Sequence, residues 1–171
     1  MTDWGAHHVD IGQWAIDQIG EGQGPLSLDP VLGEHPVPLK YGMPSKDNYY
    51  NTSHNFHIRC QFPREIELNI VSKSKHGNGV FFEGTDGDLF VSRGRLSGDG
   101  ANGLKEKPLA SDTMKKLYKG KTPTSHMENF IACVKDREDP ISDVYTHHRA
   151  MTTCHLANIA IRLGRKLKWD A

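Results

Sequence analysis

The sequence predicts an α+β fold, in which a mostly antiparallel β-sheet carries helices on one face and leaves the other face open for oligomerisation. Three observations support this prediction. The first residues have a helical period, residues 54–96 alternate between apolar and polar, and two helical segments close the chain. No strand–helix alternation typical of a doubly wound sheet is present. The length of 171 residues suits one domain of ordinary size, so we expect a single domain over residues 1–171.

The opening segment, from Thr2 to about Gly20, is predicted to form a helix. One sector of its helical wheel is apolar and comprises Trp4, Val9, Ile11, Ala15, Ile16 and Ile19. A narrow stripe on the other side comprises Asp3, His7, Asp10 and Trp14, at spacings i, i+4, i+7 and i+11. The glycines within residues 20–24 are expected to end this helix.

The middle of the chain reads as strands joined by loops. We expect one short strand near residues 26–32 and then a long loop over 33–53, which by its length is a substrate-closing or partner-contacting segment. Residues 54–96 are expected to form an antiparallel meander. Its inward residues are Phe56, Ile58, Cys60, Phe62, Ile66, Leu68 and Ile70, and its last two strands turn at "TDGD", where Asp-Gly supplies a positive φ.

The last third of the chain is predicted to hold two helices. Residues 97–122 are polar and poor in apolar period, so we expect mostly loop there. A helix should begin with Thr124 or Ser125 as its N-cap, with Glu128 three residues after Ser125 as in a capping box, and Pro140 should end it. A longer helix should begin at Ser142 or Asp143 and carry the basic residues of "GRKLKW" in its last turn, where they complement the helix dipole.

Composition excludes several function classes. Lys plus Arg and Asp plus Glu balance at 21 each, which gives no electrostatic reason to expect nucleic acid or an anionic membrane as partner. No apolar run approaches the ~20 residues that span a bilayer, and the first residues do not resemble a signal peptide. The three cysteines are Cys60, Cys133 and Cys154. Their spacing favours buried free thiols in a reducing compartment, so we expect a cytoplasmic protein.

The polar stripe of the opening helix is the candidate catalytic feature. Its spacing places Asp3, His7 and Asp10 on one face, within reach of one small ligand. A carboxylate beside an imidazole sets the tautomer of the ring and raises its basicity, which suits removal of a proton from a hydroxyl group. The alternative is a solvated helix face with an acid at its start, which spacing alone favours.

Other chemistries have weaker support. Histidines also cluster at His147, His148 and His155, but His7 and His8 point about 100° apart on a regular helix and cannot both ligate one ion. The sequence contains neither HExxH nor GxSxG, so a metal site or a serine nucleophile is disfavoured. "GEGQG" at 20–24 follows a helix rather than a strand, and we do not interpret it as a dinucleotide-binding loop.

Three segments together resemble a known family. "DWGAHHVDIGQW" is similar to the pattern D-x-x-x-H-x-x-D-x-x-x-W at the start of the C-terminal domain in the glucose–fructose oxidoreductase / inositol dehydrogenase / rhizopine-catabolism (Gfo/Idh/MocA) family, with Asp3, His7, Asp10 and Trp14 at the matched positions. "FEGTDGDLFVSRG" resembles a strand–turn–strand of that domain. "HMENFIACVKDREDPISDVYTHHRAMTTCHLANIAIRLGRKLKWD" resembles its closing helices, so the resemblance spans nearly the whole chain.

This resemblance implies an oxidoreductase that acts on a sugar, a polyol or a related hydroxyl compound. His7 would move the hydroxyl proton while hydride passes to NAD or NADP, Asp3 would assist His7, and Asp10 would contact substrate hydroxyls. His8, His147 and His148 are further candidate substrate-binding residues. The open sheet face would make a homo-oligomer.

The sequence departs from the family in one large respect. The N-terminal Rossmann domain and its E-K-P-type motif are not present, and "EKP" at 106–108 stands in a different context. We therefore expect a substrate-side domain that binds no dinucleotide by itself and is inactive alone. Two alternatives remain: a non-catalytic self-associating module, and a metal-assisted sugar lyase or hydrolase that uses the histidine clusters.

Overall fold

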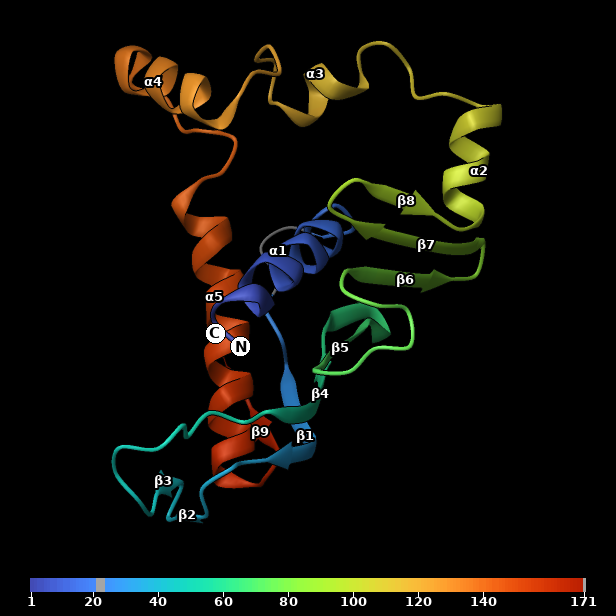
Figure 1. The fold of residues 1–171 in the computed structure, drawn as a ribbon. Helices are drawn as coiled ribbons and strands as arrows, with labels where there is room; N and C mark the ends of the chain where they lie inside the picture. The colour runs from blue at the N-terminus through green and yellow to red at the C-terminus, as the bar shows by residue number, and fades with distance from the viewer. Residues whose placement is uncertain (21–23, 171) are drawn as a thin grey trace. The chain divides into compact units, whose positions relative to one another are not determined.

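The computed structural model describes residues 1–20 and 24–170. They fall into two compact units, one of Met1–Val80 with Thr146–Ala171 and the other of Phe81–Tyr145 (Figure 1). Both units combine helices with sheets whose described pairings are antiparallel, which confirms the predicted α+β class. The expectation of one domain over 1–171 stays a prediction. None of the helices within the described residues is long and apolar enough to cross a membrane.

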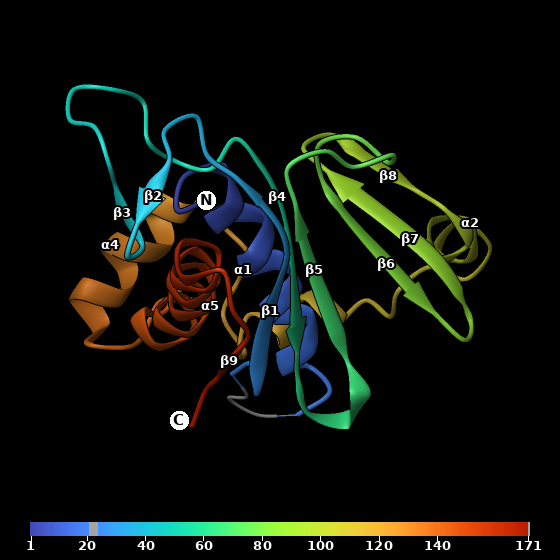
Figure 2. The same cartoon turned by 90° about the horizontal axis from the view of Figure 1, so that it is seen from below.

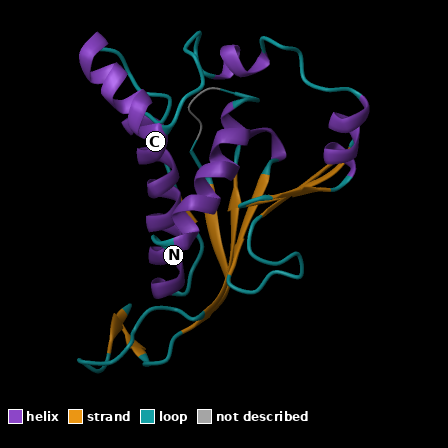
Figure 3. Ribbon diagram, turned by 45° about the horizontal axis from the view of Figure 1, so that its top comes forward, coloured by secondary structure: helices purple, strands orange, loops and turns teal. Residues whose placement is uncertain are grey.

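The first unit is built on a four-stranded sheet in the order β5-β4-β1-β9. Its strands are β1 (Ser27–Glu34), β4 (Asn55–Gln61), β5 (Glu67–Val71) and β9 (Leu167–Lys168), and a short 3-10 turn (Pro63–Glu65) separates β4 from β5. Helices α1 (Trp4–Asp17) and α5 (Val144–Leu163) lie against the same face of this sheet (Figures 2 and 3). The core of the unit fills the space between that face and the two helices.

Alternation along the strands explains this core. Leu28 of β1 pairs with Cys60 of β4, which pairs with Leu68 of β5, so apolar side chains share one face across three strands. Leu28, Ile58, Cys60 and Phe62 are at most 1% exposed, and the predicted inward positions of β4 and β5 are confirmed. The small residues Ala150, Ala157 and Ala160 bring α5 close to this layer.

The predicted core face of α1 is correct at Val9 and Ile16 but wrong at Trp4 and Ile19, because the helix is rotated about its axis relative to the prediction. Trp4 and Ile19 are 51% and 55% exposed, whereas the buried residues are Val9, Gly12, Gln13 and Ile16. Gly12 explains the rotation, because a Cβ at this position would lie 3.2 Å from Leu68 Cδ1. A side chain there would hold α1 away from β5, so the glycine selects the face that approaches the sheet.

Residues 33–53 contain two short strands rather than a featureless loop. These are β2 (Leu39–Lys40) and β3 (Met43–Pro44), joined by Tyr41 and Gly42, both at positive φ. Arg162 of α5 donates from Nε to the carbonyl oxygen of Gly42 over 2.7 Å. This segment is therefore tied to the C-terminal end of α5.

The second unit holds a three-stranded sheet, in the order β6-β7-β8, and three helices. The strands are β6 (Val80–Gly84), β7 (Gly87–Ser92) and β8 (Arg95–Ser97); the helices are α2 (Asp99–Glu106), α3 (Thr113–Leu117) and α4 (His126–Asp136). The predicted meander over 54–96 is thus divided between two sheets, because the polar residues 72–79 interrupt the strand pattern. The expected loop over 97–122 is also wrong, since α2 packs on β7 and β8 and buries Ala101.

The helix ends differ from the predictions in three places. Helix α4 has the predicted capping box at Ser125 but ends where Arg137 adopts a left-handed conformation (φ 58°), before Pro140 is reached. Helix α5 ends at Leu163, and "LK" (Leu167–Lys168) in "GRKLKW" forms β9 beside β1 rather than part of a last helical turn. Helix α1 ends at Asp17, before the predicted glycine stop, and the "GEGQG" segment lies partly outside the described residues.

Candidate functional site

The predicted stripe lies along one side of α1. Asp3 immediately precedes the helix at its N-cap, and His7 and Asp10 follow about one and two turns later. Asp3 and His7 are exposed, and Asp10 is half-buried. The Asp3 side chain makes no capping hydrogen bond, and no described hydrogen bond or ion pair joins it to His7. The structure therefore places the two on one face without bringing them into contact.

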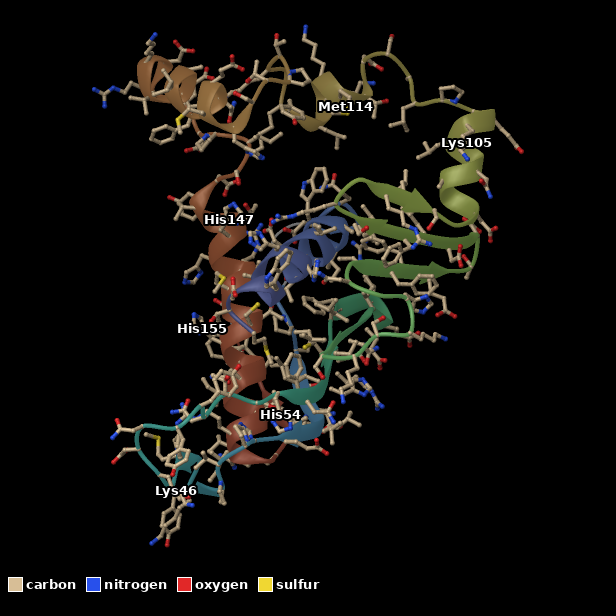
Figure 4. All side chains as sticks on the ribbon, in the orientation of Figure 1. Lys46, His54, Lys105, Met114, His147 and His155 are labelled. Carbon is tan, nitrogen blue, oxygen red and sulfur yellow. The ribbon has the colours of Figure 1, made fainter. Side chains whose placement is uncertain are left out.

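Asp10 is in contact with a histidine of α5. Its Oδ1 lies 3.3 Å from Nδ1 of His147, with the Asp10 side chain 38% exposed and the His147 side chain 46% exposed. Figure 4 labels His147 near the N-terminal end of α5. This pair joins residues 137 positions apart, and the carboxylate restrains the orientation of the imidazole ring. Sequence analysis named both residues but could not pair them.

Trp4, which sequence analysis assigned to the core, is instead exposed next to the stripe. Its ring centroid lies 6.1 Å from that of His7 and 6.3 Å from that of His8. Trp4 is therefore an exposed indole beside two imidazoles, at spacings i+3 and i+4. A flat apolar ring beside polar groups suits the C–H face of a sugar ring. The matching spacing to both histidines was a signal that the sequence contained.

Other candidates are less well placed. His148 is exposed, and its backbone carbonyl oxygen accepts a hydrogen bond from the hydroxyl of Thr152 over 2.8 Å. His155 lies about two turns further along α5 and is also exposed (Figure 4). Within the described residues, no group of three or more His, Cys, Asp or Glu could hold a metal ion.

Beneath the stripe, a second contact joins α1 to α5. Arg149 Nη2 donates to Asp17 Oδ2 over 3.0 Å, and Gln13 Nε2 donates to Asp17 Oδ1 over 3.0 Å. On α1, Asp10 and Asp17 are seven residues apart. Their partners on α5, His147 and Arg149, are only two residues apart. The helices therefore cross rather than run side by side, and the crossing holds Asp10 against His147.

A hollow described in the first unit lies away from the α1 stripe. It has a volume of about 500 Å³ and is lined by residues of the 33–42 segment and by Ile161–Gly164 of the α5 end. Burial lowers the pKa of His35 in its wall, and the nearby positive charges of Arg162 and His54 lower it further. His147 and Arg162 are separated by ~22 Å along α5, so this hollow is not part of the α1 stripe.

The cysteines are structural. All three are free and buried, as predicted. Burial raises the pKa of the Cys60 thiol to about 12 and that of the Cys154 thiol to about 11. Thiols with such pKa values carry almost no thiolate at neutral pH, so neither is a nucleophile.

The described residues form no Rossmann-type dinucleotide site. Such a site is built on a parallel βαβ unit with a glycine-rich turn between strand and helix. Every strand pair whose register is described here is antiparallel, and no such turn follows a strand within residues 1–20 and 24–170.

Comparison with known proteins shows one likeness, in structure. No protein-family model and no curated protein matches the sequence. A crystal structure of aldose–aldose oxidoreductase from Caulobacter crescentus, complexed with glycerol, matches with a TM-score of 0.53 and 12% sequence identity. The match covers 96% of this chain and 46% of that chain, so this chain spans about half the length of its structural neighbour. At this identity the likeness shows a shared fold.

Proposed function

We propose that the chain is the C-terminal, substrate-side domain of a Gfo/Idh/MocA-type NAD(P)-dependent oxidoreductase acting on a sugar, a polyol or a related hydroxyl compound. One observation carries the proposal: in the α1 stripe of Asp3, His7 and Asp10, the carboxylate of Asp10 contacts His147 of α5. The exposed Trp4 lies beside His7 of the same stripe. The fold shared with nearly half of a sugar oxidoreductase supports it.

The chemistry assigned to the stripe is binding and proton transfer. His7 accepts a proton from a substrate hydroxyl through an imidazole nitrogen that is free of its own proton. Asp10 accepts hydrogen bonds from neighbouring hydroxyls, and His147 holds its carboxylate in place. Asp3, about one turn before His7, is its proposed partner in this step. His8 and His148 are the remaining proposed substrate contacts.

The nicotinamide cofactor stands outside this chemistry. Because the described residues form no Rossmann-type site for NAD or NADP, we propose that the chain is inactive alone. Calorimetric titration of the chain with NAD, NADP and their reduced forms should detect no binding. Micromolar affinity would contradict this part of the proposal.

Self-association through the outer face of the four-stranded sheet is a further part of the proposal. That face is polar, and its side chains pair with one another: Arg59 Nε lies 3.4 Å from Glu67 Oε2, and His57 Nε2 lies 2.6 Å from Asn69 Oδ1. A second copy that binds this face would therefore contact polar side chains that are already paired with one another. The metal-assisted alternative gains no support from the described residues.

Substrate binding can be tested on the chain as it stands. Titration with glucose and glycerol, followed through the imidazole proton resonances, should shift the signals of His7 and His147 and leave His76 unchanged. Asp10→Asn should weaken binding about tenfold, because a charged acceptor hydrogen bond is replaced by a neutral one. The matched control is Asp47→Asn, in the exposed 33–53 segment. Equal affinity of the two variants would remove Asp10 from the site.

The role of His7 in proton transfer is tested in an enzyme that carries out the whole oxidation. In an enzyme that joins this chain to a dinucleotide-binding domain, His7→Ala should lower turnover by about 10² or more, the usual scale for a lost acid/base. An unchanged rate would exclude His7 from this role. His126→Ala, at an exposed position in the second unit, is the matched control.

A further inference from the structure

Helix α4 carries an exposed apolar surface that the proposed function does not use. Its residues, here called the α4 stripe, are Met127, Phe130, Ile131 and Val134, which are 69%, 54%, 44% and 52% exposed. Their spacing of i, i+3, i+4 and i+7 confines them to about 100° of the helix surface. Four large apolar side chains on one side of an 11-residue helix form a contiguous patch of the kind that marks an interaction site.

The orientation of the stripe is fixed by contacts on the opposite side of α4. Asn129 and Cys133 are 6% and 5% exposed. Asn129 Oδ1 accepts a hydrogen bond from the backbone N–H of Ile141 over 3.1 Å, and the ammonium of Lys121 lies 3.3 Å from Cys133 Sγ. These contacts attach the polar side of α4 to its own unit, so the helix presents the stripe outward.

Charges beside the stripe identify its occupant. Glu128 and Lys135 are seven residues apart and therefore lie on the same flank of α4, separated by ~10 Å along the axis. A shallow groove of about 380 Å³ runs along this flank and includes both residues in its walls. When two copies of one helix pair antiparallel about a two-fold axis, each flank meets its own reversed copy. Glu128 of either copy would then face Lys135 of the other.

We propose that α4 docks against α4 of a second copy of this chain, antiparallel, with the stripes in contact and two Glu128–Lys135 pairs at the edge. The capping box leaves room for this pairing, because Ser125 contacts Oε2 of Glu128 through both its N–H and its hydroxyl, at 3.1 Å and 2.9 Å. Oε1 of the same carboxylate remains available to the partner. The interface is small, which predicts a dissociation constant of roughly 10⁻⁵–10⁻⁴ M.

Sedimentation equilibrium of the full chain over about 10–500 µM tests the proposal. The chain should dimerise, and Lys135→Glu should weaken the dimer about tenfold or more, because it places like charges opposite one another at both edges. Lys105→Glu makes the same charge change on α2 and should have no effect. Mixing Lys135→Glu with Glu128→Lys should restore a heterodimer, since each edge again holds opposite charges.

Three results would overturn the proposal. If the chain stays monomeric at the highest concentration, the α4 stripe does not bind a second copy. A dimer that resists Lys135→Glu but is lost in Arg59→Glu forms through the outer sheet face instead. A dimer that persists in Ile131→Lys, with helix content unchanged by circular dichroism, does not use the stripe. Ile131→Lys leaves the capping box intact, so it still tests the α4 stripe if Glu128→Lys loses helix content together with its cap.

Discussion

Replacing Arg149 should destabilise the first unit by leaving a nearly buried carboxylate without its cation. The Asp17 side chain is 11% exposed and the Arg149 side chain 27% exposed, with 3.0 Å between Arg149 Nη2 and Asp17 Oδ2. Asp17 is also the last residue of α1, where the helix dipole disfavours an acid. Breaking a fully buried pair from one side costs about 3–5 kcal/mol. Because Arg149 is about a quarter exposed, we expect about 2–3 kcal/mol for Arg149→Met, which keeps most of the aliphatic packing.

Urea unfolding monitored by circular dichroism measures this cost. The double variant Asp17→Asn with Arg149→Met should recover at least about 1 kcal/mol of the loss, because it removes the stranded charge. Arg165→Met, at an exposed position just beyond α5, should stay within ~0.5 kcal/mol of the parent chain. A loss below ~0.5 kcal/mol in Arg149→Met would refute the reasoning.

The remaining predictions concern thiols, pH and a turn. Cys60 and Cys154 should not react with a disulfide reagent at neutral pH until the chain unfolds, because burial raises both pKa values; fast labelling of folded protein would contradict this. The backbone N–H of Ser125 lowers the pKa of Glu128. The capping carboxylate therefore stabilises α4 fully above the ordinary pKa of a glutamate, and this stabilisation is lost as the pH falls through the lowered pKa. In Glu128→Gln, an acid titration should show no loss of helix content from this group. Gly98→Ala should cost about 1–3 kcal/mol in urea unfolding, because φ is +105° and its Cβ would lie 2.9 Å from a backbone oxygen of β7.

Local signals were sufficient for part of the fold. The capping box of Ser125 and Glu128 is contained in four residues, and it starts α4 where the sequence predicted. The inward positions of β4 and β5 follow from period-two alternation, which any half-buried strand requires. These features depend on neighbours along the chain, so a single sequence is enough to find them.

The errors arise where distant residues decide the outcome. The face of α1 is selected by the approach of Gly12 to Leu68, which no helical wheel contains. Helix α2 forms despite two internal glycines, because Ala101 packs on the neighbouring strands and Asp88 accepts a hydrogen bond from the N–H of Asp99 over 3.0 Å. Strand β9 exists because residues 167–168 pair with β1, which lies 139 to 141 positions earlier in the chain.

The candidate site shows the same division. Asp3, His7 and Asp10 share a face by spacing alone, whereas the contact of Asp10 with His147 needs the crossing of α1 and α5. Both partners of that contact remain between a third and a half exposed. Hydrogen bonds to an incoming hydroxyl compound would therefore compete with water, and each would contribute only about 0.5–1.5 kcal/mol. Tight sugar binding needs a second surface to exclude water from the stripe, which is the physical reason to expect weak binding and no turnover from this chain alone.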